Sequence, residues 1–422
     1  MKVVLVHRGA RDNFQVARGL SDAGLLDSLV TDLYWPAERG WARSIERIAP
    51  AAASRALRAR YAESLPSKSV ISCWASGFSS HAISKMPLVP FEWQRDSVRW
   101  CDRQLGTRAG KVASARGAAL LSYSYYGHSA FSNYHGDQPR ILFQLHPHPS
   151  RVRTILHDEL ALHPECAPSL AKEWELALPD EDFNRLNEET KMAESWLVAS
   201  SFTKQTLVET GVPADRIRVI PYGIDVDKYN FAKNNSSRRK PIQLLFVGTI
   251  GQRKGIKYLL DALDALPASA VELTVCGRAV DDLNLFRNKA NVRVHPSISA
   301  QGLMDAYQAA DVFVFPSLAE GFAQVLLEAM AAGLPIISTT RTAAPDLIRQ
   351  GQEGFVIEPG NVPEIVNAIE YFLKRPEAIR TMGNAARLRA ELFTWSRFRT
   401  GVAEAVDGIL HQPELAGAHG HV

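Results

Sequence analysis

Short apolar runs alternate with amphipathic stretches along the second half of the chain. The runs have the length of buried strands, and the stretches between them place apolar side chains with the period of a helix. The pattern predicts a parallel α/β layer structure of about 150 residues. Its strands are expected at 242–248, 271–277, 292–295, 311–317 and 334–339, with helices at 255–266 and 300–310 and one more directly before the last strand.

The first half repeats this pattern less regularly. An apolar run at 2–6 is followed by a loop, an amphipathic stretch at 14–25 and a second run at 27–35. Asp12, with Gln15 three residues later, resembles a capping box, which places the start of the helix at Asp12. The order of strand, loop, helix and strand predicts a second parallel sheet, whose later strands lie at 140–146, 195–201 and 217–225.

A polar stretch separates the two halves. Residues 228–241 contain Asn-Asn-Ser-Ser and end at Pro241, which is typical of a linker. The predicted fold class is therefore α/β, with two Rossmann-like parallel-sheet domains, residues 1–227 and residues 242–395, facing a cleft. Ligands of such folds bind beyond the carboxyl ends of the strands.

The composition excludes several classes of protein. The 422 residues are 46% hydrophobic and 22% charged, and a net charge of +3 gives no reason to expect a nucleic-acid partner. No apolar run approaches the roughly 18 residues of a membrane-spanning helix, and the first run is too short for a signal peptide. No cysteine lies in a CxxC pair, so reduced thiols in a cytoplasmic protein are predicted for Cys73, Cys101, Cys166 and Cys276.

Residues 38–68 are rich in arginine and alanine. The interpretation that we favour is a pair of surface helices with a solvated basic face, because long helices usually carry such a face. The alternative is a patch that touches anionic lipid or an acidic acceptor, which would place the protein peripherally on the inner face of a membrane.

Two glutamates bracket the first turns of the helix that precedes the last predicted strand. Glu320 follows a strand, and the amides of Gly321, Phe322 and Ala323 come next, where a phosphate or a sugar is favourably held. About 12 Å separates Glu320 from Glu328 along a helix, more than the roughly 5–9.5 Å between the carboxyl groups of a glycosidase. The pair suits the two ends of one elongated ligand, although Glu328 alone is more simply a solvated helix residue.

A glycine-bearing loop one unit earlier carries two cations. Residues 246–260 contain a strand, a loop with Arg253 and Lys254, and a helix. Small residues let backbone N–H groups approach an anion, and the two side chains add positive charge. The loop matches neither the P-loop pattern nor GxGxxG. Because this loop and Glu320 both follow strands of one sheet, we expect them at the same edge.

The stretch EGFAQVLLE, with seven residues between its glutamates, resembles the EX7E signature of family 4 retaining glycosyltransferases of the GT-B fold. The segments FVGTIGQRKGIKYLLDAL, LMDAYQAADVFVFPS and GQEGFVIEPGNVPEIVNAI resemble the family pattern in order and spacing. The resemblance is good over roughly residues 190–400 and faint before them. It implies a last helix, within residues 396–422, that crosses back to the first domain.

The resemblance implies roles for residues of the second domain. Lys254 matches the lysine that contacts the donor diphosphate, and Arg253 takes a cationic role because Thr249 stands where the family often has arginine. Glu320 matches the glutamate that contacts the donor sugar together with the amides after it. Glu328 matches the residue that binds the ribose hydroxyls.

On the first domain, His146 matches a family histidine that faces the donor sugar, with a structural loop histidine as the alternative. Gly9, which is all that remains of a double-glycine loop, is assigned to the donor site. Other departures are Pro296, in the loop that frames the base, and Asp346, where the family often has glutamate. Neither the base nor the acceptor follows from the resemblance.

The implied reaction transfers a sugar from a nucleoside-diphosphate sugar to a glycan or glycolipid hydroxyl, with retention of configuration and without a metal ion, as in polysaccharide synthesis. One alternative is a metal-dependent GT-A transferase with Asp225 and Asp227 as its DxD, although the two-half layout disfavours that fold. The others are a GT-B enzyme that epimerises or hydrolyses a nucleotide-sugar, and a non-catalytic module that keeps the donor site.

Overall fold

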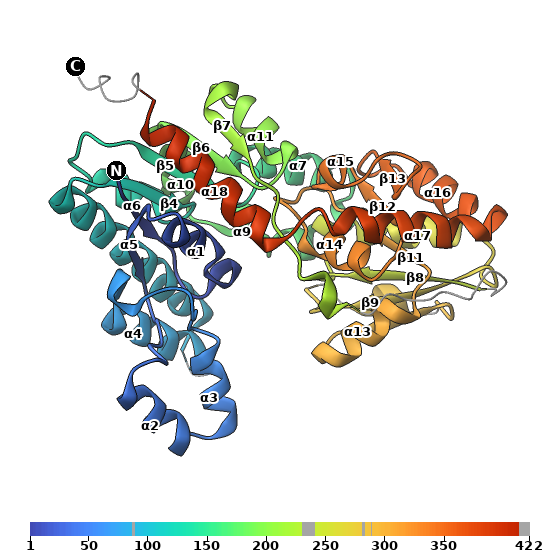
Figure 1. The fold of residues 1–422 in the computed structure, drawn as a ribbon. Coiled ribbons are helices and arrows are strands. Elements are labelled where there is room, and N and C mark those ends of the chain that lie inside the picture. Colours follow the sequence, from blue (N-terminus) through green and yellow to red (C-terminus); the bar gives the residue numbers. More distant parts are fainter. Residues whose placement is uncertain (87–88, 230–240, 281–282, 288, 413–422) are drawn as a thin grey trace.

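The computed structural model describes residues 1–86, 89–229, 241–280, 283–287 and 289–412. Within them the chain forms a seven-stranded and a six-stranded sheet, and the strands of each are parallel. Figure 1 shows the N-terminal domain on the left and the C-terminal domain on the right. The two-domain parallel α/β fold predicted from the sequence is confirmed.

The N-terminal sheet has the strand order β3-β2-β1-β4-β5-β6-β7. The order in which successive strands are added to the sheet reverses between β1 and β4, and the carboxyl ends of these two parallel strands border a crevice. The strands are β1 Val3–Val6, β2 Leu26–Thr31, β3 Val70–Ser72, β4 Ala119–Tyr123, β5 Arg140–Gln144, β6 Ser195–Val198 and β7 Ile217–Val219.

The C-terminal sheet has the order β10-β9-β8-β11-β12-β13, and the equivalent reversal lies between β8 and β11. The cationic loop follows β8, and Glu320 follows β11, so both come from the strands that flank this point. The strands are β8 Ile242–Val247, β9 Val271–Cys276, β10 Val292–His295, β11 Val312–Phe315, β12 Ile336–Thr339 and β13 Gly354–Ile357.

Helices connect the strands, and most of those in the described ranges bury an apolar side, whereas α2 and α3 bury almost none. Those before β7 are α1 Gln15–Asp22, α2 Gly40–Ile48, α3 Ala51–Arg58, α4 Trp74–Lys85, α5 Phe91–Arg116, α6 Gly127–Ser132, α7 Pro149–Leu162, α8 Ala167–Leu170, α9 Trp174–Ala177, α10 Asp180–Met192 and α11 Ser201–Val208. Those after β8 are α12 Ile256–Asp264, α13 Ala300–Ala309, α14 Gln324–Ala331, α15 Ala344–Leu347, α16 Val362–Lys374, α17 Pro376–Ala390 and α18 Trp395–Leu410. None of the helices in the described ranges is long and apolar enough to cross a membrane.

Every predicted strand is present, but three strands were not predicted: β3, β4 and β13. The strand β4 is buried at every position and comes shortly after the 26-residue helix α5. A fully buried run next to a helix has no alternation to mark it as a strand. Of the predicted linker 228–241, residues 230–240 lie outside the described residues.

The first helix begins at Gln15, not at Asp12 as predicted. Asp12, Asn13 and Phe14 have left-handed φ angles of 46°, 53° and 61°, so the chain makes a tight turn before the helix. The predicted capping contact nevertheless exists, because the Asp12 carboxylate accepts the Gln15 amide at 2.8 Å. The capping pattern identified the hydrogen bond and missed the turn between its partners.

The segment between β5 and β6 reaches the C-terminal domain. Val152, Ile155, Leu156 and Leu170 are buried in the same apolar core as the strands of the second sheet. We call residues 149–177 the arm. The arm is continuous in sequence with the N-terminal sheet, yet it buries apolar side chains against the C-terminal domain.

The chain returns to the N-terminal domain through α18, which lies across α1 (Figure 1). Phe398, Val402, Val406 and Ile409 on this helix are buried in the core of the N-terminal sheet. The crossing helix implied by the family resemblance is therefore present.

Gly19 lies where α1 meets α18, and a Cβ at this position would lie 2.7 Å from the carbonyl oxygen of Arg399. We expect Gly19→Ala to lower the free energy of unfolding by about 1–3 kcal/mol, because the added methyl group forces the helices apart. Gly408→Ala on α18 is the matched control. No atom would lie within 4 Å of its Cβ, so it should stabilise the protein by about 0.5–1 kcal/mol.

Urea unfolding measures both variants. Equal effects of the two substitutions would contradict the close packing of α18 on α1.

Candidate functional site

A cavity of about 460 Å³ lies between the two domains. Its N-terminal wall comes from the loop after β1 and from the carboxyl ends of β4 and β5, and its C-terminal wall comes from the turn between β11 and α14. The lining residues are Arg11, Asp12, Asn13, Tyr123, Leu145, His146, Tyr222, Glu320, Gly321, Phe322, Ala323, Gln324 and Trp395. The cavity therefore sits at the edge where a doubly wound fold binds its ligands.

Charged side chains meet beside the C-terminal wall. Lys254 ends the short 3-10 turn η6, Gln252–Lys254, and its ammonium group contacts the Glu320 carboxylate. The Nη1 atom of Arg253 lies 3.1 Å from the same Glu320 oxygen and 2.9 Å from the carbonyl oxygen of Ala319. The structure thus brings together three of the residues singled out from the sequence.

The arm holds this turn from the other half of the chain. The Nε atom of Arg253 donates to Glu173 at 2.6 Å. The Gln252 backbone amide donates to Ser169 Oγ at 2.8 Å, and its side-chain amide donates to Glu159 at 2.6 Å. Glu159 is buried, where a carboxylate persists only if it is hydrogen-bonded. The position of the cations consequently depends on residues of both halves.

Burial dominates the electrostatics of Lys254, whose side chain is 11% exposed. Desolvation and the neighbouring Arg253 guanidinium lower the pKa of Lys254, while the carboxylates of Glu173 and Glu175 act in the opposite direction. The charged ammonium therefore needs an anion beside it. Glu320 supplies that anion in this structure, and a phosphate group has the charge to replace it.

His146 faces this cluster from the end of β5. Desolvation, followed by the charges of Arg253, Arg11 and Lys254, lowers the pKa of His146 to about 3. His146 is exposed within the cavity, and all three cations shift its pKa in the same direction. The imidazole is neutral at pH 7, and it can donate or accept one hydrogen bond there without carrying charge.

The turn before α14 offers free backbone donors. Within the described residues, the amides of Gly321, Phe322 and Ala323 have no hydrogen-bond acceptor, and all three residues line the cavity. Ala323 is the N-cap residue of α14, and Gly321 and Phe322 lie in the turn directly before it. Such amides suit the oxygen atoms of a sugar or a phosphate.

Gly321 is also where the domains approach each other closely. A Cβ at this position would lie 2.0 Å from the carbonyl oxygen of Leu145. The carbonyl oxygen of Gly321 accepts a hydrogen bond from Ser200 and another from Thr203 at 3.2 Å, both at the start of α11. Only glycine fits between the two domains here.

Glu328 lies apart from this cluster and does not line the cavity beside Glu320. The hydroxyl of Tyr307 donates to it at 2.9 Å. Desolvation raises the pKa of Glu328, while the hydroxyls of Tyr307 and Tyr229 act to lower it. Glu328 is therefore not the solvated helix residue that its spacing alone favours.

Three further residues from the sequence analysis have protein partners. The Gly9 amide donates to Asp32 at 2.8 Å, so it is already occupied. Asp346 accepts the Ser201 amide at 2.8 Å and joins the C-terminal domain to the start of α11. Asp225 pairs with Lys228 at 3.2 Å, as a turn residue does.

The sequence analysis missed the N-terminal wall of the cavity. Arg11, Asp12 and Asn13 line it together with Tyr123, and Asp12 was considered only as a helix cap. Tyr123 donates to the Asp12 carboxylate, and burial raises the pKa of Asp12 to about 7. Successive left-handed residues store backbone strain, which often marks a functional site. The one signal in the sequence was a polar loop after the first strand.

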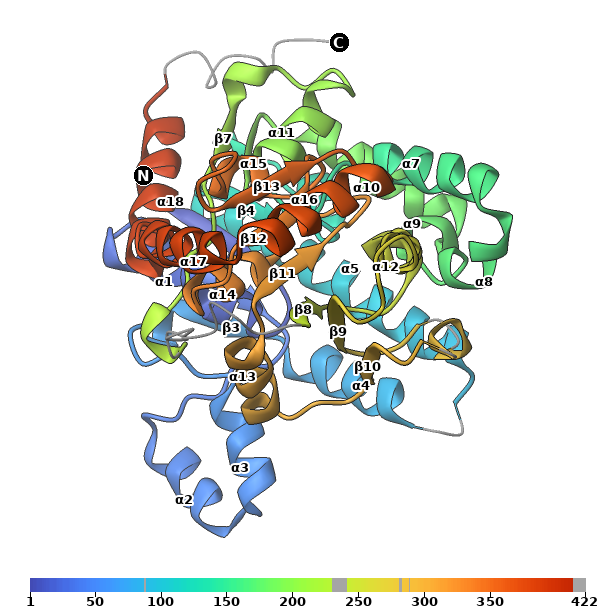
Figure 2. The same cartoon turned by 90° about the vertical axis from the view of Figure 1, so that its right-hand side faces the viewer.

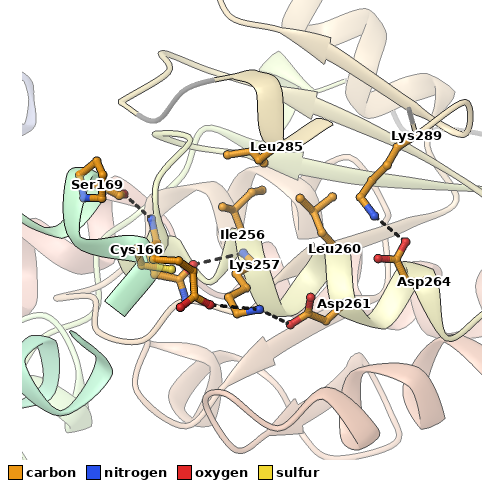
Figure 3. A pocket seen from close by; sticks show the side chains of 12 residues that line it. Cys166, Ser169, Ile256, Lys257, Leu260, Asp261, Asp264, Leu285 and Lys289 are labelled. Carbon is orange, nitrogen blue, oxygen red and sulfur yellow. Dashed lines mark hydrogen bonds and ion pairs between the residues drawn. The ribbon is translucent and has the colours of Figure 1, made fainter. Parts of the chain in front are cut away.

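Two more cavities flank the cationic turn. One, of about 720 Å³, lies between the arm and the loops after β8 and β9, where Thr249, Arg253 and Arg278 contribute to its lining. The other, of about 390 Å³, lies between the arm and α12. Figure 3 shows that Ile256, Leu260 and Leu285 give it an apolar wall with ion pairs along its rim. This second cavity shares Gln252 with the turn but contains neither Glu320 nor His146.

His7 is a buried titratable group behind the cavity. It follows β1 and packs between the rings of Phe14 and Tyr123, at centroid distances of 5.8 and 5.0 Å. Desolvation, followed by the charge of Arg11, lowers the pKa of His7 to about 4. His7 is therefore neutral in the folded protein at pH 7.

Comparisons with known proteins find relatives of this chain. Residues 227–389 match the family model for glycosyl transferases group 1. The chain is 28% identical over 225 residues to the sulfoquinovosyl transferase SQD2 of Arabidopsis thaliana. The aligned region covers 50% of this chain and 44% of that protein. It is 30% identical over 216 residues to a D-inositol 3-phosphate glycosyltransferase of Pseudarthrobacter chlorophenolicus, with coverages of 47% and 51%. The chain thus spans about half the length of these curated relatives.

Solved structures match over nearly the whole chain. Sucrose-phosphate synthase of Thermosynechococcus elongatus has a TM-score of 0.65 at 16% identity and covers 97% of this chain and 99% of its own. HepE of Anabaena in complex with UDP has a TM-score of 0.60 at 16% identity, with coverages of 97% and 100%. At these identities the likeness shows the fold, and the fold is GT-B.

We expect His7→Phe to weaken the dependence of stability on pH. The pKa of His7 is lower in the folded protein than its ordinary value of 6.5, so the unfolded chain binds the proton first as the pH falls. The free energy of unfolding should therefore decrease on acidification from pH 7 to pH 5, with about 2 kcal/mol due to this residue. Phenylalanine removes the proton site and fits the aromatic neighbours.

Urea unfolding of wild type and variant at both pH values measures this difference. An identical decrease in the two proteins would show that His7 binds protons equally in the folded and unfolded states.

Proposed function

We propose that this protein is a glycosyltransferase that moves a sugar from a nucleoside-diphosphate sugar to an acceptor hydroxyl, with retention of configuration. The observation that carries the proposal is the cluster of Lys254, Arg253 and Glu320, which lies beside free amides and opposite His146. The match of residues 227–389 to glycosyl transferases group 1 supports it. So does the fold shared with HepE, whose solved complexes contain UDP, UDP-glucose, or UDP and glucose.

The cationic turn would stabilise the leaving diphosphate. One further negative charge develops on the diphosphate as the bond between the sugar and its phosphate breaks, and fixed cations in a site that excludes water counter it strongly. Lys254 and Arg253 are held by Glu320 and Glu173 before the donor arrives. The donor phosphates would take the place of Glu320, and no metal ion would be required.

Glu320, once displaced, would accept hydrogen bonds from hydroxyls of the transferred sugar. The amides of Gly321, Phe322 and Ala323 would donate to the sugar or to the nearer phosphate. Neutral His146 would hold the sugar from the opposite wall without adding charge. For retention the acceptor attacks from the side of the leaving group, and the departing phosphate takes its proton.

Glu328 would bind the ribose hydroxyls. Its carboxylate already accepts a hydrogen bond from Tyr307, and one carboxylate has room for several more. The tyrosines orient it, and their hydroxyls offset part of the desolvation that raises its pKa.

The acceptor would lie against the N-terminal wall, which Arg11, Asp12, Asn13 and Trp395 line. These side chains pair polar groups with one aromatic ring, a combination that suits a sugar. We propose a glycan or glycolipid acceptor in polysaccharide or glycolipid synthesis, in the cytoplasm and at the inner face of a membrane.

Lys254→Met should lower kcat by about 100-fold or more while the protein stays folded, because methionine keeps the buried volume and removes the cation. Lys257→Met, in the first turn of α12 and paired with Asp261, is the matched control and should retain activity. Initial rates of release of the nucleoside diphosphate measure both. Wild-type turnover in Lys254→Met would remove the diphosphate role of this residue.

Glu320→Gln and Glu328→Gln should change different kinetic constants. The first alters a contact to the transferred sugar, so kcat should fall; the second alters a contact to the ribose, so the donor KM should rise with little change in kcat. Steady-state kinetics over a range of donor concentrations separates the two effects. Small and equal effects would place both residues outside the donor site.

Transfer should persist in excess EDTA, and NMR early in the reaction should show the donor's anomeric configuration in the product. Asp227→Asn should be nearly silent. Loss of activity in EDTA with rescue by manganese would favour a metal-dependent site. An inverted product would exclude the retaining assignment, and free sugar without any acceptor would indicate a hydrolase.

A further inference from the structure

The helices α2 and α3 form a hairpin that projects from the N-terminal domain. In α2 only Ala42 is buried, and in α3 no residue is buried. Figures 1 and 2 show the hairpin at the lower end of the molecule in both views, away from the two sheets. A pair of short helices without a buried face gains little from tertiary packing, which normally stabilises helices of this length.

One face of α2 is apolar. Trp41, Ile45 and Ile48 recur at positions i, i+4 and i+7, which places them on one stripe. Their exposed fractions are 49%, 41% and 85%. The Trp41 ring packs against Trp35 in a T-shaped arrangement, at a centroid distance of 5.5 Å, and still leaves half of Trp41 exposed. The stripe therefore points away from the protein that carries it.

The same hairpin has an excess of positive charge. Residues 39–60 contain six arginines and one glutamate. That glutamate, Glu46, already accepts hydrogen bonds from Trp35 and Arg58. In the part of the chain that the structure describes, no carboxylate pairs with the arginines near the stripe: Arg39, Arg43, Arg47 and Arg55.

Exposed apolar side chains are frequent in this part of the sequence. Of the fourteen large hydrophobic residues that are exposed in the described ranges, eight lie between positions 41 and 100. Scattered exposed residues need no explanation, but Trp41, Ile45 and Ile48 adjoin one another on one face of a helix, as the residues of an interaction surface do. The eight are Trp41, Ile45, Ile48, Trp74, Phe78, Met86, Trp93 and Trp100.

We propose that the α2–α3 hairpin docks this protein on an anionic phospholipid bilayer. Trp41, Ile45 and Ile48 insert at the level of the headgroups, and the arginines lie over the lipid phosphates. A second copy of this chain would bring the same positive charge to the contact, so charge complementarity favours an anionic lipid surface. This inference deepens the proposed function, in which a glycolipid acceptor is met at a membrane, but its test uses no activity, so either can fail alone.

Co-sedimentation with vesicles tests the proposal on the full chain. Binding is expected to vesicles of phosphatidylcholine with phosphatidylglycerol, and to be weak with phosphatidylcholine alone. Arg43→Gln combined with Arg47→Gln should lower the partition coefficient roughly 25-fold, since each basic residue contributes about fivefold. Ile48→Asp should lower it at least about tenfold by removing an inserted side chain and adding a negative charge.

Arg380→Gln and Leu388→Asp are matched controls, because both residues are exposed on α17 of the C-terminal domain. They should leave vesicle binding unchanged. The hairpin side chains are exposed as well, so their variants should keep the wild-type melting temperature. Equal losses in the hairpin and control variants would overturn the proposal.

Fluorescence quenching by brominated lipids checks insertion, with Trp41→Phe identifying the signal of Trp41 among the eight tryptophans. Quenching that disappears in this variant supports the proposal. Binding without quenching of Trp41 would reduce the hairpin to a general binder of polyanions. A concentration-dependent dimer that Ile48→Asp abolishes in sedimentation velocity would assign the surface to a second copy instead.

Discussion

The ion pair between Lys254 and Glu320 is the interaction on which the rest of the site depends. A buried ammonium group is costly unless an anion lies beside it, and Glu320 is that anion here. In the proposed function, the negatively charged phosphates of the donor replace it. Arg253 shares the same carboxylate and is fixed in turn by Glu173 of the arm. In the proposed function the two cations are already ordered by these carboxylates, and Glu320 is the group that moves when the donor phosphates bind; cations fixed in advance favour strong electrostatic stabilisation.

The arm connects this cluster of charged residues to the other half of the chain. Glu159 and Ser169 hold Gln252, so the turn that bears the cations is fixed by residues that lie between β5 and β6 of the other sheet. The segment in which the chain returns to the N-terminal domain is also held by close contacts. Ile224 donates its amide to Phe393 at 2.8 Å, and the two connecting segments run side by side before α18 joins the N-terminal core. Movement of one domain against the other would therefore strain or break the contacts of Gln252 with the arm and of Ile224 with Phe393.

The sequence was most informative where each element carries its own signal. The strands of the C-terminal half are short buried runs with helices between them, and Lys254 and Glu320 could be placed at one edge because both follow strands of one sheet. Three kinds of feature were not predicted from the sequence. The strand β4 has no alternation, the partners of Gln252 depend on the path of the arm, and the shielding of Glu328 by Tyr307 joins residues 21 positions apart. Each of these is decided by tertiary packing, which a local pattern does not record. The strained turn at Asp12 was not predicted either, and the Tyr123 hydroxyl that contacts its carboxylate lies on a strand distant in sequence.

In the proposed function, the turn of Arg253 and Lys254 receives the diphosphate of a nucleotide-sugar. A thermal-shift screen over nucleotide-sugars and their nucleoside monophosphates tests it without knowledge of the acceptor, because a ligand of the folded state raises the melting temperature by mass action. The account predicts that at least one nucleoside-diphosphate sugar stabilises the wild type, that the matching monophosphate does so far less, and that Lys254→Met loses the difference. A panel in which monophosphates stabilise the protein as well as the diphosphate sugars, or in which Lys254→Met responds like the wild type, would contradict it.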